Sequence, residues 1–335
     1  MNVTFAGSPD RAEARLVPEA GYELDTFRIT GLPRTPGAAF ARAAWLAARA
    51  PFACGRILAR RQPDVVLGGG GFVAGPMVLA AWRQRIPAAV TEADAQLGLA
   101  NRLATPFARR IFLAYPPPHG EKTRVVGRPI APRSHVVPRA QARAVFELPM
   151  EGPVLLVAGA LAGARALNEL AVESFGAAGP AVLHISGQRD YDLLRGRVSR
   201  SDYRLIPFAE NFGAALGAAN LAIARAGGTV WELAAAGLPA ILVPYPFATG
   251  DHQTQNARYF ERGGGAIVVP ETELGRVPDI ARSLLDDADR LAAMSTAMRA
   301  LAKPDAARAI AEELIELASS RSSGGAGGVG PEGTV

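Results

Sequence analysis

The sequence predicts an α/β protein of two domains, each built on a parallel sheet with helices on both faces. Its 335 residues exceed one ordinary domain and suffice for two separate cores. Short, uniformly apolar runs alternate with helical stretches along most of the chain, which indicates parallel strands buried on both faces. Glycine-rich loops follow three of these runs. Because parallel sheets bind ligands at the carboxyl ends of their strands, these loops are the first candidates for a site.

Eight apolar runs are the strand candidates, four in each predicted domain. They are Val3–Ala6, Val65–Leu67, Ala88–Val90 and Ile111–Leu113, followed by Val154–Val157, Val182–Ile185, Leu221–Ala224 and Ile241–Val243. The glycine loops that come directly after three of them are Gly68–Gly71, Gly159–Gly163 and Gly227–Gly228.

The domain boundary is predicted in the segment GRPIAPRSHVVP, residues 127–138, which contains three prolines. An apolar strand starts again after it, at Val154. The predicted domains are therefore residues 1–131 and residues 132–319. Residues 320–335 read SRSSGGAGGVGPEGTV and cannot bury enough apolar surface to fold, so a disordered tail is predicted.

Composition restricts the compartment and the partners. Apolar residues make up 49% and charged residues 20%, as in globular proteins. The single cysteine, Cys54, argues against a disulfide framework and indicates a reducing cytoplasm. The opening MNVTFAGSPD lacks a signal-peptide pattern, and no apolar run reaches the ~18 residues of a spanning helix. The net charge of +5 suits phosphate-bearing substrates or an anionic membrane, whereas the dispersed arginines argue against nucleic acid.

The segment Arg225–Asn256 carries the most informative pattern, RAGGTVWELAAAGLPAILVPYPFATGDHQTQN. A strand leads into Gly227–Gly228 and a helix starts near Thr229, where free N–H groups and the helix dipole favour a diphosphate. Glu232, one turn further, could accept hydrogen bonds from both ribose hydroxyls, and the loop of residues 251–255 offers neutral groups suited to a sugar. The alternative is an ordinary strand-to-helix turn with a solvated glutamate.

This segment resembles the nucleotide-sugar motif of glycosyltransferase family 28, in the branch that transfers N-acetylglucosamine to lipid I in peptidoglycan synthesis. The family pattern is approximately R-[SA]-G-A-x-T-x-x-E, then AAAGLPAxxVPxP and DHQxxNA; this chain is one residue shorter before Thr229. Three more segments are similar to family motifs, namely GGGGFVAGP at 68–76, TEADAQLGLANR at 91–102 and GALAGARALNE at 159–169. The resemblance covers nearly the whole chain except its tail. It implies the GT-B fold, two Rossmann-like domains that face a cleft.

The resemblance assigns the donor, UDP-N-acetylglucosamine, to the second domain. Glu232 would bind the ribose and Gln253 the N-acetylglucosamine, while Gly228 and Thr229 would contact the nucleotide. Gly159, Gly163 and Arg225 would complete the donor site.

The resemblance also implies catalytic and acceptor residues, mainly in the first domain. Glu92 matches a family carboxylate close to the reaction centre, and Asp94 replaces a family asparagine that contacts a sugar. Glu92 has a structural alternative, because it could instead cap the helix of residues 98–107 or pair with Arg102. The acceptor, the undecaprenyl-diphosphate-linked lipid I, would bind Gly69, Gly70, Gly71, Asn101 and Arg128.

The transfer is expected to need neither a metal nor a cofactor. An inverting transfer requires a base for the acceptor hydroxyl and stabilisation of the leaving UDP. No carboxylate pair suited to a metal–diphosphate bridge is evident after the glycine loops, and the four histidines show no metal-ligand spacing. We therefore expect the helix that starts near Thr229 to neutralise the diphosphate instead.

The chain departs from the family pattern at several positions. Leu161 and Ala160 replace a serine and a glycine of the third loop, Thr91 replaces a histidine, and Ala131 replaces an arginine. The strand Val3–Ala6 matches the family's second strand, so the first strand and its GGTxGH loop have no counterpart. We therefore expect the first sheet to lack a central strand. Either an upstream start supplies this strand, or the front of the chain folds poorly.

A basic helix face predicts contact with a membrane. Arg42, Arg49 and Arg56 recur every seven residues and share one face, with Trp45 nearby. The alternative is an ordinary solvated face with Trp45 in the core, and Pro51 is expected to interrupt the helix. The lipid-linked acceptor of the family favours the membrane, which places the protein at the cytoplasmic face of the bacterial cell membrane.

The sequence therefore predicts an inverting transferase that moves N-acetylglucosamine from its UDP conjugate to lipid I. One alternative is a related transferase with another lipid acceptor, such as a diacylglycerol. Another is a catalytically inactive family member that acts as a binding protein, which Leu161 and the absent first loop favour and the intact Glu232 and Gln253 oppose.

Overall fold

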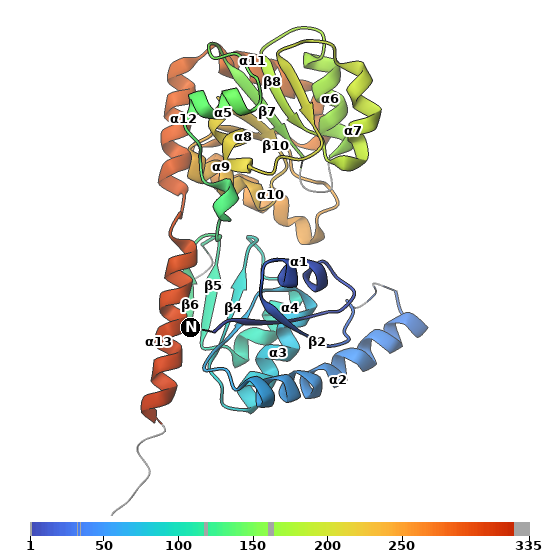
Figure 1. Cartoon of the computed structure of the whole chain (residues 1–335), viewed down its shortest axis with the longest axis vertical. Coiled ribbons are helices and arrows are strands. Elements are labelled where there is room, and N and C mark those ends of the chain that lie inside the picture. Colours follow the sequence, from blue (N-terminus) through green and yellow to red (C-terminus); the bar gives the residue numbers. More distant parts are fainter. Residues whose placement is uncertain (1, 32, 34, 117–119, 160–163, 325–335) are drawn as a thin grey trace, which may run out of the picture. The chain divides into compact units, whose positions relative to one another are not determined.

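The computed structural model describes residues 2–31, 33, 35–116, 120–159 and 164–324. The chain divides into two compact units (Figure 1). The N-terminal unit comprises Met1–Ala93, Leu97–Val126 and Arg308–Val335, and the C-terminal unit comprises Asp94–Gln96 and Gly127–Ala307.

The C-terminal unit is a doubly wound α/β domain. Its six parallel strands follow the order β12-β11-β10-β7-β8-β9, with the topological switch between β7 and β10. The strands are β7 (Val154–Ala158), β8 (Ala181–Ile185), β9 (Tyr203–Ile206), β10 (Leu221–Ala224), β11 (Ala240–Leu242) and β12 (Ala266–Val268). The helices are α5 (Arg139–Val145), α6 (Arg165–Phe175), α7 (Gln188–Leu194), α8 (Phe212–Ala218), α9 (Thr229–Ala236), α10 (His252–Arg262), α11 (Val277–Leu285) and α12 (Ala288–Leu301).

The sheet of the C-terminal unit is buried on both faces, as its uniformly apolar strands predict. Helices α6, α7 and α11 cover one face, against side chains such as Leu155 and Ile223, and α8 and α9 contact the other. Every residue of β7 and β10 is buried. This rigid sheet holds the loops at its carboxyl edge in fixed positions.

The N-terminal unit contains two separate parallel sheets, one of order β1-β2 and one of order β3-β4-β5-β6. Helices α2 and α3 cover one face of the larger sheet, and α13 contacts the other. The strands are β1 (Thr4–Gly7), β2 (Glu23–Thr26), β3 (Val66–Gly68), β4 (Ala88–Glu92), β5 (Arg110–Leu113) and β6 (Thr123–Val125). The helices are α1 (Glu13–Glu19), α2 (Ala38–Arg61), α3 (Gly71–Arg83), α4 (Leu99–Ala104) and α13 (Ala306–Gly324).

The split sheet confirms the expectation of a missing central strand. The two sheets of this unit can be matched to the sheet of the C-terminal unit by strand order. Strands β1 and β2 then correspond to β8 and β9, and β3, β4 and β5 correspond to β10, β11 and β12. No described strand corresponds to the central β7. The apolar side chains of Phe5 in β1 and Leu67 in β3 are accordingly 41% and 40% exposed. In the C-terminal unit, the matching strands β8 and β10 carry no exposed residue.

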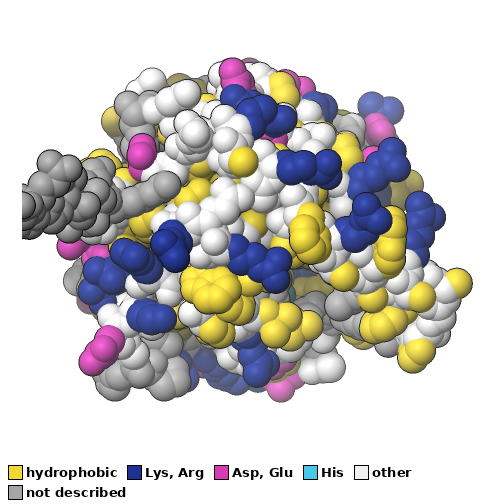
Figure 2. All heavy atoms as spheres, turned by 90° about the horizontal axis from the view of Figure 1, so that it is seen from below, with side chains coloured by type: hydrophobic (Ala, Val, Ile, Leu, Met, Phe, Trp, Pro, Cys, Tyr) yellow, Lys and Arg dark blue, Asp and Glu magenta, His cyan; other side chains and the backbone are white. Residues whose placement is uncertain are grey.

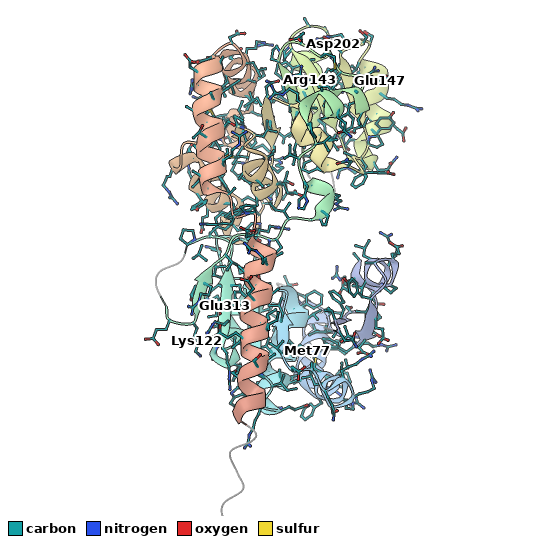
Figure 3. All side chains as sticks on the ribbon, turned by 60° about the vertical axis from the view of Figure 1, so that its left-hand side comes forward. Met77, Lys122, Arg143, Glu147, Asp202 and Glu313 are labelled. Carbon is teal, nitrogen blue, oxygen red and sulfur yellow. The ribbon has the colours of Figure 1, made fainter. Side chains whose placement is uncertain are left out.

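Helix α13 corrects the predicted division of the chain, because from Arg308 onward it belongs to the N-terminal unit. Ile310 and Leu317 pack against that unit's sheet. Glu313, on the same helix, accepts hydrogen bonds from Arg110 at 2.7 Å and Arg124 at 3.1 Å (Figure 3). Burial acts to raise the pKa of Glu313, but the two arginines outweigh it and lower this pKa overall.

The predicted tail begins too early in the sequence. Helix α13 continues to Gly324, whereas residues 320–335 were expected to be disordered. Serine is tolerated in a helix, so the four residues after Ser320 extend the last turn. The remaining residues, 325–335, lie outside the part of the chain that the structure describes.

His184 in β8 belongs to a buried polar network, as its position within an apolar strand suggests. Its Nδ1 lies 2.9 Å from the hydroxyl of Tyr203, and its Nε2 lies 3.0 Å from Oδ1 of Asn168. Since the amide oxygen can only accept, Nε2 carries the proton and Nδ1 accepts from the hydroxyl. Desolvation lowers the pKa of His184 to about 3, so the ring is neutral in the folded protein.

The unfolding free energy is expected to fall by about 2 kcal/mol between pH 7 and pH 5 because of His184. The unfolded chain protonates this ring below its ordinary pKa of about 6.5, but the folded chain does not. The stabilisation is therefore complete above pH ~6.5 and is lost as the pH falls towards the folded pKa. Urea unfolding at a series of pH values tests this. His184→Gln should flatten the slope, and His135→Gln, an exposed control, should preserve it.

Candidate functional site

The loops of interest lie together at the carboxyl edge of the C-terminal sheet. Strands β11, β10 and β7 are adjacent and parallel. The loops that begin at Gly159, Arg225 and Val243 therefore leave the sheet at one edge. This edge, next to the switch between β7 and β10, is where doubly wound sheets bind ligands.

Helix α9 begins at Thr229, directly after the predicted diphosphate loop. Gly228 is its N-terminal cap and has no side chain that could bond the first N–H groups. A Cβ atom at Gly228 would lie 2.2 Å from the guanidinium carbon of Arg128, so a larger residue here would have to displace that side chain. The start of α9 thus has the form predicted from the sequence.

Glu232 lies one turn into α9 and is held by a serine from the proline-containing segment of residues 127–138. The hydroxyl of Ser134 donates to Oε1 of Glu232 at 2.5 Å. Ser134 is 3% exposed, on a short 3-10 helix, whereas Glu232 is half-buried. The second oxygen of Glu232 makes no hydrogen bond within the described part of the chain, so it can accept one from a ligand.

Gln253 lies beside the same loop. Its Oε1 accepts from the backbone N–H of Tyr245 at 2.9 Å, which ties the loop after β11 to the start of α10. Its amide nitrogen faces Gly227, 3.8 Å from the position of a Cβ atom on that residue. The structure therefore brings Gln253 and the start of α9 together, as predicted.

Arg225 has a different role from the predicted one. Its side chain is only 8% exposed, and its Nη1 donates to the carbonyl oxygens of Val243 and Pro244 at 3.2 Å. It also forms an ion pair with Glu271. Arg225 therefore binds the chain at the end of β11, and its geometry does not support a contact with the donor.

The glycine loop after β7 is only partly described. A Cβ atom at Gly159 would lie 2.4 Å from the Cβ of Ala164, so the chain approaches itself too closely for any other residue. Gly163, also predicted for the donor site, lies outside the described residues, as does Leu161.

Asp94 groups with the C-terminal unit and contacts the first turns of α10. Its Oδ1 accepts from the amide of Asn256 at 3.0 Å, and its Oδ2 lies 4.0 Å from Nε2 of His252. Asn256 is fully buried and also donates to the carbonyl oxygen of Ala226. Asp94 therefore lies beside the start of α10, which carries Gln253, and groups with the C-terminal unit.

Glu92 caps the start of α4, which is the structural alternative to its predicted catalytic role. Its Oε1 accepts from the N–H of Ala93 at 3.0 Å, and its Oε2 accepts from the N–H of Gly98 at 2.9 Å. Gly98 is the N-terminal cap of α4, so the carboxylate fixes the start of that helix. Asn101 donates to the same Oε2 at 2.9 Å and is 2% exposed, which argues against its predicted contact with the acceptor.

The predicted acceptor loop, Gly69–Gly71, has a backbone that favours glycine. Gly70 and Gly71 have φ angles of 92° and 66°, which side-chain-bearing residues rarely adopt. Helix α3 begins at Gly71, so this loop joins β3 to α3 as a glycine turn. Arg128, the last predicted acceptor residue, lies in the C-terminal unit against Gly228 instead.

The basic helix face is present and accompanied by exposed apolar side chains (Figure 2). Arg42, Arg49 and Arg56 are all exposed on α2, and Trp45 is 57% exposed rather than in the core. The helix runs through Pro51 without interruption, contrary to expectation. Further large apolar side chains exposed on α2, α3 and α4 are Phe40, Phe52, Trp82, Leu99 and Leu103.

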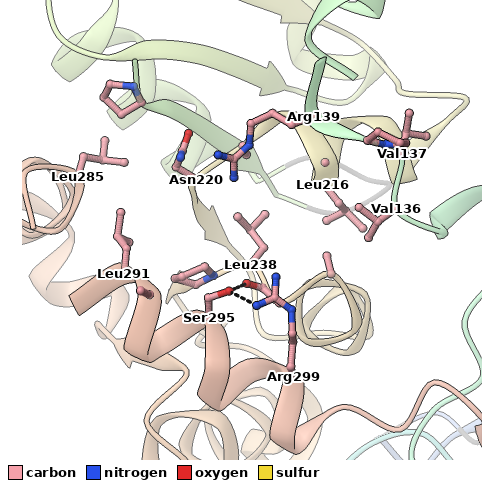
Figure 4. Close-up of a pocket in the computed structure, with 18 of the residues that line it drawn as sticks. Val136, Val137, Arg139, Leu216, Asn220, Leu238, Leu285, Leu291, Ser295 and Arg299 are labelled. Atoms are coloured by element: carbon pink, nitrogen blue, oxygen red, sulfur yellow. Dashed lines mark hydrogen bonds between the residues drawn. The ribbon is translucent and has the colours of Figure 1, made fainter. Parts of the chain in front are cut away.

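A cavity of about 740 Å³ lies at the opposite, amino edge of the C-terminal sheet (Figure 4). Pro153, Asn220 and Pro239, which line it, precede β7, β10 and β11. Arg299 also lines it and donates to the hydroxyl of Ser295 at 2.8 Å. The cavity contains none of the predicted donor residues, so it is separate from the site described above.

Two protein-family models match the chain, one in each half. Residues 1–113 match the glycosyltransferase family 28 N-terminal domain, and residues 154–310 match the glycosyltransferase family 28 C-terminal domain. The chain is 40% identical to the UDP-N-acetylglucosamine--N-acetylmuramyl-(pentapeptide) pyrophosphoryl-undecaprenol N-acetylglucosamine transferase of Acidithiobacillus ferrooxidans, over 95% of this chain and 90% of that enzyme. It is 37% identical to the enzyme of the same name from Halorhodospira halophila, over 94% of this chain and 90% of the relative.

Solved structures show the same architecture. The crystal structure of MurG from Acinetobacter baumannii superposes with a TM-score of 0.76 at 27% identity, covering 94% of this chain and 91% of that one. The calicheamicin glycosyltransferase CalG4 superposes with a TM-score of 0.67 at 19% identity, covering 96% of this chain and 91% of that one. The second likeness establishes the fold alone, which is the predicted pair of Rossmann-like domains.

Proposed function

Since the chain belongs to glycosyltransferase family 28, we propose that it transfers N-acetylglucosamine from UDP-N-acetylglucosamine to an undecaprenyl-diphosphate-linked N-acetylmuramyl-pentapeptide. The observation that carries this proposal is the 40% identity to a transferase of that name over 95% of the chain. The arrangement of the donor loops at one sheet edge supports it independently.

The donor is proposed to lie across the start of α9. The diphosphate faces Gly228 and Thr229, where the helix dipole and backbone N–H groups favour negative charge. Glu232, oriented by Ser134, accepts from the ribose hydroxyls, and Gln253 contacts the N-acetylglucosamine. Among the described residues, no cluster of three or more histidine, cysteine, aspartate or glutamate side chains could hold a metal ion. The start of α9 is proposed to stabilise the diphosphate without a metal.

The transfer itself is proposed as a single displacement at the anomeric carbon. The acceptor hydroxyl forms the new bond, the bond to UDP breaks, and a base takes the proton. Of the two predicted catalytic carboxylates, Asp94 lies beside α10, the helix that carries Gln253, through its contact with Asn256. Glu92 holds the start of α4, so Asp94 is the better candidate for the base.

A turnover assay tests the proposal directly. The purified chain is incubated with UDP-N-acetylglucosamine and either a lipid I analogue or a diacylglycerol, and release of UDP is measured. Transfer to the lipid I analogue is the expected result. Transfer only to the diacylglycerol would identify a different acceptor, and donor binding without transfer to either would indicate an inactive binding protein.

We further propose that the protein docks on the cytoplasmic face of the membrane through α2 and its neighbours. No helix among the described residues is long and apolar enough to cross a bilayer. The exposed Arg42, Arg49 and Arg56 can face anionic headgroups, while Trp45 and Phe52 can enter the interface. Arg49 lies over the ring of Trp45, 4.7 Å from its centroid, so charge and apolar surface are adjacent.

Changing Arg42, Arg49 and Arg56 to glutamate should reduce binding to anionic vesicles at least about tenfold. Each basic residue near such a surface contributes about 1 kcal/mol, and the wild-type binding should weaken with salt. Co-sedimentation with liposomes measures the effect. The matched control makes the same charge change in the C-terminal unit, at Arg139, Arg262 and Arg290. Equal binding by the two triple variants would contradict the assignment of this face.

A further inference from the structure

Arg128 lies directly against the start of α9. A Cβ atom built on Gly228 would come within 2.2 Å of its Cζ, 2.3 Å of Nη1 and 2.6 Å of Nη2. The guanidinium therefore covers the Cα of Gly228. Both residues belong to the C-terminal unit, so this contact lies within one compact body.

The surroundings of Arg128 leave its charge uncompensated. The residue is half-buried, yet it forms no hydrogen bond or ion pair with any part of the chain that the structure describes. Arg225 nearby, in contrast, is paired with Glu271 and two carbonyl oxygens. The N-terminal end of a helix carries a partial positive charge, so a guanidinium placed there is repelled. A bound anion would reverse the sign of this interaction.

We propose that Arg128 binds the diphosphate of the donor and stabilises the charge that UDP acquires on leaving. The inference rests on the proposed function and deepens it. A guanidinium offers paired N–H donors that match two phosphate oxygens. As the bond from the anomeric carbon to the diphosphate oxygen breaks, its electron pair passes to that oxygen, where Arg128 and the start of α9 stabilise it.

The neighbouring groups have the order that a nucleotide diphosphate requires. Glu232 lies one turn further along α9, where the ribose is proposed to bind, and the amide nitrogen of Gln253 lies next to Gly227. Ser134, which orients Glu232, is six residues from Arg128 in the same connecting segment. This segment therefore supplies one group that contacts the diphosphate and one that positions the ribose carboxylate.

Calorimetry with UDP, UMP and uridine separates this role from a structural one. Arg128→Ala should weaken UDP binding about tenfold or more, the scale of a charge-assisted hydrogen bond, with a smaller loss for UMP. Uridine, which has no phosphate, should bind the variant and the wild type equally. Arg133→Ala removes an exposed arginine from the same segment and should leave all three affinities unchanged.

A second variant tests the contact itself. Gly228→Ala should displace the guanidinium, so its effect on UDP binding should not add to that of Arg128→Ala in the double variant. Equal loss of uridine and UDP binding in Arg128→Ala, or no loss of UDP binding, would overturn the inference. If the wild type binds no UDP at all, the proposed function fails, which is a distinguishable result.

Discussion

Replacing Glu232 with alanine is expected to lower the affinity for UDP-N-acetylglucosamine by about 1.5–3 kcal/mol, or about 10- to 150-fold. The carboxylate is half-buried on α9, and one of its oxygens is already fixed by Ser134. Removing it leaves the ribose hydroxyls without a charged acceptor. Isothermal titration of the donor onto the wild type and the variant measures the loss.

Two further measurements separate ribose binding from a general disturbance of α9. UDP whose ribose lacks both hydroxyls should bind the wild type and Glu232→Ala with similar affinity. Ser134→Ala frees the carboxylate without removing it, so a smaller loss of about 0.5–1.5 kcal/mol is expected. An unchanged affinity of Glu232→Ala for the complete donor would remove the residue from the site.

The strands that could be predicted from the sequence are those with long apolar runs. All eight runs correspond to strands of the structure. The four strands that were not predicted, β2, β6, β9 and β12, all lie at the edge of a sheet. An edge strand has fewer neighbours and needs less apolar surface, so segments such as ELDT in β2 and TRV in β6 resemble loops.

The candidate site was predictable in its residue types but not in its partners. Glu232 could be found because a strand and two glycines precede the helix that carries it. Gln253 could be found because it follows the next strand in a recognisable order. Ser134 lies 98 positions from Glu232 along the chain, and nothing local to it indicates that contact. The local sequence also could not show that the side chains of Arg225 and Asn101 are buried against other parts of the protein and are therefore not free to bind a ligand.

Arg128 illustrates how a domain boundary can move a residue from one site to another. The prolines of residues 127–138 located the boundary within a few residues, but the structure begins the second part of the C-terminal unit at Gly127. A shift of five residues transfers Arg128 from the predicted acceptor side to the start of α9. Prolines mark an extended segment between domains but do not indicate which of the two domains the segment packs against, so they locate a boundary only to within a few residues.

Arg143 makes five hydrogen bonds to the chain at the amino edge of the C-terminal sheet (Figure 3). It is 2% exposed on α5. Desolvation, followed by the nearby charge of Arg139, lowers its pKa, and an arginine still remains protonated. Its guanidinium donates to the carbonyl oxygens of Ala218, Pro149, Met150 and Gly152 and to Oδ1 of Asn220.

Replacing Arg143 with methionine is expected to lower the free energy of unfolding by about 3–5 kcal/mol. Methionine fills a similar volume but donates nothing. It leaves the buried carbonyl of Ala218 and four partly buried acceptors without their partner, and a buried acceptor left unpaired costs about 1–3 kcal/mol. Urea unfolding of the full chain measures the loss. Arg139→Met, on an exposed position one turn earlier in α5, should change stability by less than about 0.5 kcal/mol. Because Arg143 lies at the edge opposite the donor loops, the folded fraction of Arg143→Met should bind UDP normally. A variant as stable as the wild type would show that water replaces the guanidinium at these carbonyl groups.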